Sequence, residues 1–500
     1  MDVETASLQD DLADPGSKDE HPFDERRPLS KELEIHVPDG FTLGVVGDCI
    51  ISRPLAPHRD REPAFAAVMG LLGGCDVTVG NLETTIVDAR TFRGAPYAWD
   101  GDWTLVSQPS VAEDLAELGF DLLSRANNHA LDWGLEGMRE TSRWLDEAGL
   151  VHAGTGERHG IARAPQYLES PAGRVSLVSF ASTFRPTTNT LAPRGAAPGR
   201  PGLSALRLNA IHTMPPAELE PLRSIAGNVG GRLADIAAAP PRRTIRSHLS
   251  PLTDDVEIVE AFGQRFAALE AEEPYRTTFS MDAVDVAEIL RVIRQGTQHS
   301  DFCVAAIHSH ESSAGVAPHE RPGDFLSTLA RLAIRAGTSA FVTTGIHHIG
   351  PIEIVEGRPV FYGLGNFVWS DMQEPVPFDL YEGNADLIEK AFAHPDRATD
   401  ADLTNVMNAQ HFADPTYFRG IAPVCTYERG ALREVRVTCL DMGYGLPLTR
   451  SGIPRLASAA VADEILRHLI GISAPYGTTI EVRATTVDGI ATKVGVIVAP

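Results

Sequence analysis

Cysteine is scarce in this chain of 500 residues, which holds five. The five stand at positions 49, 75, 303, 425 and 439, an odd number without the paired spacing of a zinc ribbon. The pattern argues against a disulfide framework and against a structural zinc site built from paired cysteines. Reduced thiols, mostly buried by packing, are expected instead.

Basic residues and long apolar runs are also in short supply. Lys and Arg together number 43 against 67 for Asp and Glu, which gives a formal net charge of −24. Such a surface repels phosphate backbones and anionic lipid, so neither nucleic acid nor a membrane is an expected partner. Because no apolar run reaches the ~20 residues that a membrane helix needs, no membrane insertion is expected.

The first 36 residues lack the basic region and the apolar core of a secretory signal. They are acidic and poor in large apolar residues, which predicts a flexible N-terminal tail over residues 1–36. We therefore expect a cytoplasmic protein.

Short apolar runs alternate with helix-like patterns along the remaining chain. Runs that read as buried strands lie at 43–46, 77–79, 122–124, 175–180, 304–307, 341–343, 352–355 and 360–362. Helical spacing is found at 64–72, 111–118, 135–148, 282–295 and 322–336. This alternation predicts an α/β layered fold.

Two stretches break the rhythm and are interpreted as insertions in one domain over residues 37–470. Residues 185–250 are rich in Pro, Arg and Gly and include a helical stretch near 217–239, whereas residues 370–420 are by turns polar, acidic and aromatic. Residues 471–500 are expected to form a C-terminal extension that contains a strand.

Metal-ligand residue types follow several predicted strands. In an α/β sheet, ligands bind at the carboxyl ends of the strands. The segments at those ends are Gly47-Asp48, Gly80–Glu83, Arg125–His129 with Asp132, His308–Glu311 and Thr344–His347. A turn or a helix cap explains each segment taken alone. Their conjunction favours a divalent metal site with oxygen and imidazole ligands, of the kind that Mn, Fe, Zn or Mg occupies.

The order of these motifs resembles the CapA / poly-γ-glutamate capsule-biosynthesis family of the calcineurin-like metallophosphoesterase superfamily. The resemblance runs from about residue 41 to 369, with its most specific elements in NNHALDWG (127–134) and in IEIVEGRPVFYGLGNF (352–367). It implies a four-layer αββα sandwich with a metal site at the strand ends. It also implies one or two divalent ions per chain, and mixed oxygen and nitrogen ligands do not choose between Mn, Fe, Zn and Ca.

Ligand positions carry over from the resemblance residue by residue. The implied metal ligands are Asp48, Glu83, Asn128, His308 and His347, with Glu83 at the position that can bridge two ions. His129 matches the histidine that acts on the leaving group in phosphoesterases.

Two departures weaken the implied two-metal site. The opening Asp-x-His motif reads Asp48-Cys49-Ile50 here, so one histidine is missing. The closing motif reads Thr344-Gly345-Ile346-His347, with threonine in place of its first histidine. The site therefore holds one ion, or a second ion weakly.

Acid–base candidates remain beside these ligands. Asp132 either orients His129, as a carboxylate behind an imidazole does, or stands at the start of the following helix, and both alternatives are open. His310 lies two residues after His308, so on an extended segment both imidazoles point to the same side. We therefore name His129, Asp132 and His310 as catalytic candidates.

Three functions fit these residues. The first is a metal-dependent hydrolase that acts on a peptide, amide or phosphoester and is linked to poly-γ-glutamate-type or peptide metabolism. The second is a metal-dependent peptide epimerase with His/Asp acid–base pairs, and the third is a non-catalytic component of capsule polymer synthesis. The expected partner is a small-molecule or peptide substrate.

The stretch TTGIHHIGP (343–351) holds two adjacent histidines between two predicted strands. Because a strand points neighbouring side chains to opposite faces, we expect only one of them to face the site. The resemblance assigns the ligand position to His347 and a variable position to His348.

Overall fold

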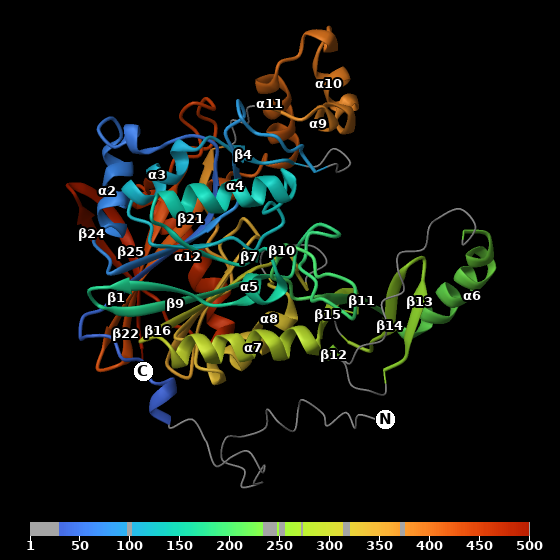
Figure 1. Ribbon diagram of the computed structural model, residues 1–500, viewed down its shortest axis with the longest axis horizontal. Coiled ribbons are helices and arrows are strands. Elements are labelled where there is room, and N and C mark those ends of the chain that lie inside the picture. The colour runs from blue at the N-terminus through green and yellow to red at the C-terminus, as the bar shows by residue number, and fades with distance from the viewer. Residues whose placement is uncertain are drawn as a thin grey trace.

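The computed structural model describes residues 30–97, 103–233, 248–249, 256–271, 274–313, 321–370 and 376–499. Residues 1–29 of the expected tail lie outside the described residues, and residues 30–36 include a short 3-10 helix, Ser30–Leu33. The described part contains two large sheets, a five-stranded sheet and two two-stranded sheets, with helices packed around them (Figure 1).

The larger sheet has ten strands. Its central strand β1 (Thr42–Ile51) pairs in parallel with β2 (Val77–Leu82) and β20 (Asn366–Ser370), and antiparallel with β21 (Arg419–Glu428). Beyond β2 lie β5 (Leu122–Ser124) and β6 (Val151–Ala153); beyond β21 lie β22 (Ala431–Asp441), β23 (Arg455–Leu456), β25 (Ile490–Val498) and β24 (Glu481–Val487). The expected C-terminal extension therefore supplies two strands of this sheet.

The second sheet has six strands. Their order is β18 (Ile352–Val355), β19 (Arg358–Phe361), β17 (Ala340–Thr344), β16 (Phe302–His308), β9 (Gly173–Ala181) and β8 (Gln166–Ser170). The inner strands β19, β17, β16 and β9 run in parallel. Their carboxyl ends therefore meet at one edge of the sheet.

Alternate residues of β16 show how the layers pack. Phe302, Val304 and Ala306 belong to a core shared with Leu43 and Val77 of the larger sheet. The intervening residues of β16 face another core, formed with the helices α7 (Ala283–Gln298) and α8 (Asp324–Arg335). This period of two is what a strand buried on both faces requires.

The larger sheet is covered in the same way on its outer face. A separate core joins it to α2 (Pro63–Leu72), α3 (Ser110–Glu117) and α4 (Gly134–Glu147). In Figure 1 these helices lie above the sheets and α7 lies below them. Helix α12 (Ala459–Ser473) packs against β22 and β25 and adds its apolar face to the core between the sheets.

The first expected insertion contributes two strands, β11 (Leu208–Met214) and β12 (His248–Leu249), to a small five-stranded sheet. Its order is β12, β15 (Arg276–Asp282), β11, β14 (Gln264–Ala268) and β13 (Ile258–Ala261). Helix α6 (Pro216–Leu233) packs on β13 and β14, and the unit projects to the right in Figure 1. It therefore continues past residue 250, where we had expected the insertion to end.

The second expected insertion forms three helices between β20 and β21. They are α9 (Phe378–Gly383), α10 (Ala385–Ala391) and α11 (Asp400–His411), at the top of Figure 1. Thr399 and Asp402 form a capping box that starts α11. Other short elements include β3 (Thr85–Ile86), β4 (Val106–Ser107), β7 (Thr155–Gly156), β10 (Gly202–Leu203) and α5 (His159–Arg163).

The predicted α/β fold is confirmed, and each expected strand and helix named above has a counterpart in the structure. The apolar runs predicted the strands because both faces of these strands are buried. Among the described residues, no helix combines the length and the apolar character that crossing a bilayer demands.

A buried ion-pair network ties α5, α7 and the start of β11 together, and its loss should destabilise the fold. Arg163 Nη2 donates a hydrogen bond to Asp285 Oδ1 at 2.8 Å. Arg207 donates to the same carboxylate from Nε at 2.6 Å and from Nη2 at 2.7 Å. We predict that Asp285→Ala lowers the free energy of unfolding by about 3–5 kcal/mol, because two arginines lose their buried partner. Urea denaturation measures the change.

The matched control is Glu169→Ala. Glu169 also meets an arginine, Arg174, at 2.8 Å, but both side chains are largely exposed. A loss of no more than about 1 kcal/mol is expected there. Equal losses in the two variants would contradict the role assigned to the Asp285 network.

Candidate metal centre

The carboxyl ends of five parallel strands from both large sheets meet at one place. Strands β1, β2 and β5 of the larger sheet and β16 and β17 of the smaller one end there. They bring together most of the polar residues that the sequence placed at strand ends: Asp48, Glu83, His129, Asp132, His308, His310 and His347. Asn128 directly precedes His129 in the chain.

Asp48 is positioned by a break in the β1 ladder. The register of β1 against β2 shifts between Val45 and Asp48, and a bulge of this kind re-aims a side chain. A Cβ built on Gly47 would lie 1.8 Å from the carbonyl oxygen of Gly365, so only glycine lets the two backbones approach. In the Gly-Asp motif, Gly47 is therefore required for packing, and Asp48 supplies a carboxylate to the candidate site.

The carboxylate of Asp48 is fixed by three donors. Asn81 Nδ2 donates to Oδ1 at 2.8 Å and the backbone N–H of Gly345 donates to Oδ2 at 3.0 Å. His347 Nδ1 lies 3.3 Å from Oδ2. Burial raises the pKa of Asp48, but the hydrogen bond and charge of His347 outweigh it and hold the pKa below its usual range.

Glu83 lies beside Asp48 without comparable support. Its side chain is fully buried, and neither carboxylate oxygen has a hydrogen-bond partner among the described residues. Burial and the negative charge of Asp48 raise its pKa well above the usual value. A buried carboxylate without donors is costly, and a cation removes that cost, so this side chain fits a metal ligand.

His308 lies at the end of β16 and is buried. Its Nε2 is 3.4 Å from Glu83 Oε1, while its Nδ1 lies 3.2 Å from the hydroxyl of Thr344. Burial lowers the pKa of His308 to about 3, which keeps the imidazole neutral as a ligand must be. Thr344, where the resemblance implies a histidine, therefore contacts the imidazole of His308 from behind.

Two groups of side chains could each hold an ion. Asp48, Glu83 and His347 form one, and Glu83, His308 and His310 form the other, with the ligand atoms of each group within 4.8 Å of one another. Glu83 belongs to both, as expected for a bridging carboxylate. His310, which we had cast as an acid–base residue, thus belongs to a potential ligand group, and its Nε2 lies 2.9 Å from that of His308.

Asparagines near the centre have different roles. Asn128 is half-buried, and its Oδ1 is buried without a hydrogen-bond partner in the described part of the chain, which leaves it free to ligate. Asn127 instead donates to Asn81 Oδ1 at 3.2 Å and to Leu82 O at 2.8 Å, and Asn366 contacts His347 Nδ1 at 2.9 Å. Sequence reasoning assigned no role to Asn81, Asn127 or Asn366, although each lies within a quoted motif.

His129 and Asp132 form a buried pair at the edge of the centre. His129 Nδ1 lies 2.7 Å from Asp132 Oδ2, which also accepts the backbone N–H of Leu105 at 2.6 Å. Helix α4 begins at Gly134 with Trp133 as its N-cap, so Asp132 precedes the cap. Of the two alternatives for Asp132, the structure shows the contact that orients His129. His129 is also close enough for its charge to lower the pKa of His308, after burial and His347.

The adjacent histidines of 343–351 are separated in a way that we had not expected. They lie in the loop after β17 rather than on a strand, and His347 has a positive φ of 55°. That backbone turn sends His347 toward Asp48, whereas the His348 ring packs on Tyr417 at 4.2 Å. The choice of His347 agrees with this geometry, but strand alternation is the wrong reason for it.

Comparison with known proteins gives the family. Residues 42–371, more than half of the chain, match the family described as "Bacterial capsule synthesis protein PGA_cap". The chain belongs to this family, which lies in the metallophosphoesterase-like superfamily.

Individual relatives agree with the family match. Over 469 residues, covering 92% of this chain and 95% of the relative, the chain is 38% identical to uncharacterized protein y4sH of Sinorhizobium fredii. It is 20% identical over 341 residues to "PGA biosynthesis protein CapA" of Bacillus subtilis, covering 68% of this chain and 66% of that protein. It is 27% identical over 149 residues to "Capsule biosynthesis protein CapA" of Bacillus anthracis, covering 29% and 35%.

The unsupported carboxylate leads to a prediction about stability. Glu83→Gln should raise the stability of the metal-free protein at neutral pH by about 1–3 kcal/mol, because folding no longer has to protonate this carboxyl or bury its charge beside Asp48. The same change should abolish stabilisation by added Mn²⁺. Thermal unfolding with EDTA and then with excess Mn²⁺ measures both effects.

Asp114→Asn is the control. Asp114 is also a buried carboxyl with a raised pKa, but it accepts the N–H groups of Leu55 and Ala56 and belongs to neither ligand group. Its variant should keep the full Mn²⁺ response. A Glu83→Gln protein that is still stabilised by Mn²⁺ would remove Glu83 from the centre.

Proposed function

We propose that this protein is a metal-dependent hydrolase whose centre is built on Asp48, Glu83, His308 and His347. The observation that carries the proposal is Glu83, a buried carboxylate without donors that two potential ligand groups share. His310 and Asn128 are the additional ligands proposed. Sharing of Glu83 supports up to two ions, with His310 compensating for the histidine that Thr344 replaces.

The residues around the centre supply the remaining chemistry. A divalent ion held here would act as a Lewis acid and lower the pKa of bound water. His129, oriented by Asp132 through its Nδ1, can exchange a proton through Nε2 with a leaving group. Asp132 stabilises the imidazolium that forms when His129 holds two protons.

The proposed substrate class rests on the printed names of relatives. Relatives carry the printed names "Capsule biosynthesis protein CapA" and "PGA biosynthesis protein CapA". We propose a peptide, amide or phosphoester substrate connected with capsule-type polymer or peptide metabolism. We also propose a cytoplasmic location, and a four-layer αββα sandwich is supported by the two facing sheets with helices on their outer faces.

Epimerisation is less well supported by the same geometry. It needs two acid–base groups on opposite sides of a substrate Cα, and His310 was the second candidate beside His129. His310 Nε2 lies 2.9 Å from His308 Nε2 within a potential ligand group, which argues for ligation instead. Solvent deuterium entering a peptide Cα without cleavage would nevertheless overturn hydrolysis in favour of epimerisation.

Activity is tested with bis(p-nitrophenyl) phosphate and γ-glutamyl-p-nitroanilide in the Mn²⁺-loaded protein. We predict that Asp48→Ala abolishes turnover of whichever compound is hydrolysed, and that His129→Gln lowers kcat by a factor on the order of 10²–10⁴ while metal content is unchanged. Asp132→Asn should lower kcat less and shift its pH profile, because it acts through His129. Turnover that is indifferent to Asp48→Ala would reject the assigned centre.

Metal content is tested with a pair of neighbouring histidines. His347→Ala should lose at least half of the bound metal in elemental analysis, because one ligand group loses its imidazole. His348→Ala is the control, since His348 packs on Tyr417 and belongs to neither group. Equal metal content in both variants would show that His347 is not a ligand.

A further inference from the structure

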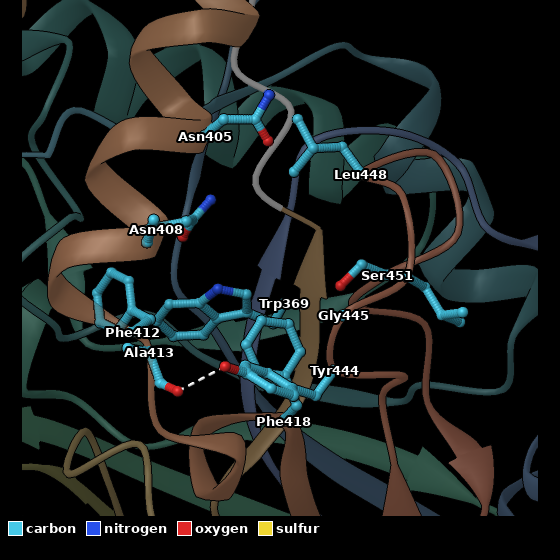
Figure 2. A pocket seen from close by; sticks show the side chains of 12 residues that line it. Trp369, Asn405, Asn408, Phe412, Ala413, Phe418, Tyr444, Gly445, Leu448 and Ser451 are labelled. Carbon is cyan, nitrogen blue, oxygen red and sulfur yellow. Dashed lines mark hydrogen bonds between the residues drawn. The ribbon is translucent and has the colours of Figure 1, made fainter. Parts of the chain in front are cut away.

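A cavity of about 280 Å³ is lined by Trp369, whose ring also contacts that of His347. Figure 2 shows it between α11, which presents Asn405 and Asn408, and the segment 444–451, which presents Tyr444 and Ser451. Its volume is at the lower limit of small-molecule sites, which run from roughly 300 to 1,000 Å³. It therefore suits a single ring or side chain rather than a length of polymer.

The lining is aromatic and uncharged. Trp369, Phe412, Phe418 and Tyr444 supply rings, and the remaining lining residues are Asn405, Asn408, Ala409, Ala413, Gly445, Leu446, Leu448 and Ser451. Tyr444 is held by a 2.6 Å hydrogen bond to the carbonyl oxygen of Ala413, drawn as the dashed line in Figure 2. An anion would lose its hydration here without a compensating charge, so the lining selects neutral groups.

The indole nitrogen of Trp369 gives the cavity a polar feature. The side chain is 5% exposed, and Nε1 is buried with no hydrogen-bond partner in the part of the chain that the structure describes. In Figure 2 this nitrogen is on the edge of the indole that faces the space between Asn408 and Ser451. A buried donor without an acceptor costs free energy, which a ligand oxygen would recover.

Trp369 also connects the cavity to the candidate metal centre. Its ring meets His347 edge-on, with centroids 5.1 Å apart, and meets Phe412 of the cavity wall at 4.6 Å. Whatever occupies the cavity therefore packs against the same indole that packs against a proposed ligand.

We propose that this cavity binds a neutral aromatic group bearing a hydrogen-bond acceptor, received by Trp369 Nε1, and that its occupancy changes metal affinity through Trp369. The second part rests on the proposed function. The group is either a side chain of the substrate or a separate small molecule, and both present the same chemistry to the cavity.

Binding is tested by ligand-observed NMR with three probes. We expect p-cresol to bind with a dissociation constant on the order of 1 mM, and 4-hydroxybenzoate, which carries a charge, to bind about tenfold more weakly or not at all. Trp369→Phe should weaken the binding of p-cresol by about three- to tenfold. The same change should leave the binding of toluene, which has no acceptor, unchanged.

Matched substitutions on the helical insertion locate the site. Ala409→Phe fills the cavity from an exposed position on α11 and should abolish binding of p-cresol. Phe378→Ser, at a side chain 72% exposed on α9 outside the cavity, should leave binding unchanged. Binding that survives Ala409→Phe, stronger binding of 4-hydroxybenzoate, or no saturable binding at about 10 mM overturns the proposal.

The connection to the metal centre has its own measurement. The Mn²⁺ dissociation constant, determined with and without saturating p-cresol, should change by about fivefold or more in wild type and not in Ala409→Phe. An unchanged constant in wild type overturns the coupling and leaves the binding site standing. Failure of Mn²⁺ to bind at all rejects the proposed function and the coupling. In that case the p-cresol measurement still tests whether the cavity is a binding site.

A substrate side chain and a separate small molecule are then distinguished by kinetics. With whichever chromogenic compound the enzyme turns over, p-cresol should inhibit competitively if the cavity receives part of the substrate. A change in kcat without competition assigns the cavity to a separate ligand. Either result upholds binding, and absence of any kinetic effect at a subsaturating Mn²⁺ concentration overturns the coupling.

Discussion

Two carboxylates buried next to each other are the constraint on which the site depends. Asp48 is held by donors from Asn81, Gly345 and His347, but Glu83 has no such donors in the described structure. Like charges at low dielectric are costly, so the surrounding imidazoles and the proposed cation have to compensate for them. The groups that compensate for the two carboxylates therefore decide both the stability of the strand ends and the ability of the site to bind a cation.

The strands that carry the candidate ligands form a rigid scaffold. The ligands come from the ends of strands that are buried on both faces, in two sheets that share one core. Sites built on such elements hold their geometry better than sites on loops. Glu83, Asn128, His310 and His347 lie just after a strand rather than in it. His347 in addition needs a positive φ to reach Asp48.

Much of the fold and of the candidate site could be predicted from the sequence. Buried parallel strands appear as continuous apolar runs, and the polar residues that follow these runs mark the site. Thr344 and His310 show where that approach stops. A threonine can be seen to replace a histidine, but its contact behind His308 depends on how β16 and β17 pair. The small sheet was missed because its strands are half-exposed and polar, and the cavity beside Trp369 because its walls come from α11, β20 and the 444–451 segment, which only the fold brings together.

The contact between Gly47 and Gly365 has a consequence for how the protein is made. Strand β1 emerges early from the ribosome, yet its bulge packs on a backbone that is synthesised more than 300 residues later, and β20 and β21 complete its pairing. Pairing over such separations is slow because chain entropy must be lost first. A nascent chain that stops before β20 thus carries Asp48 on an unfinished strand, and metal capture is expected as a late, nearly post-translational event.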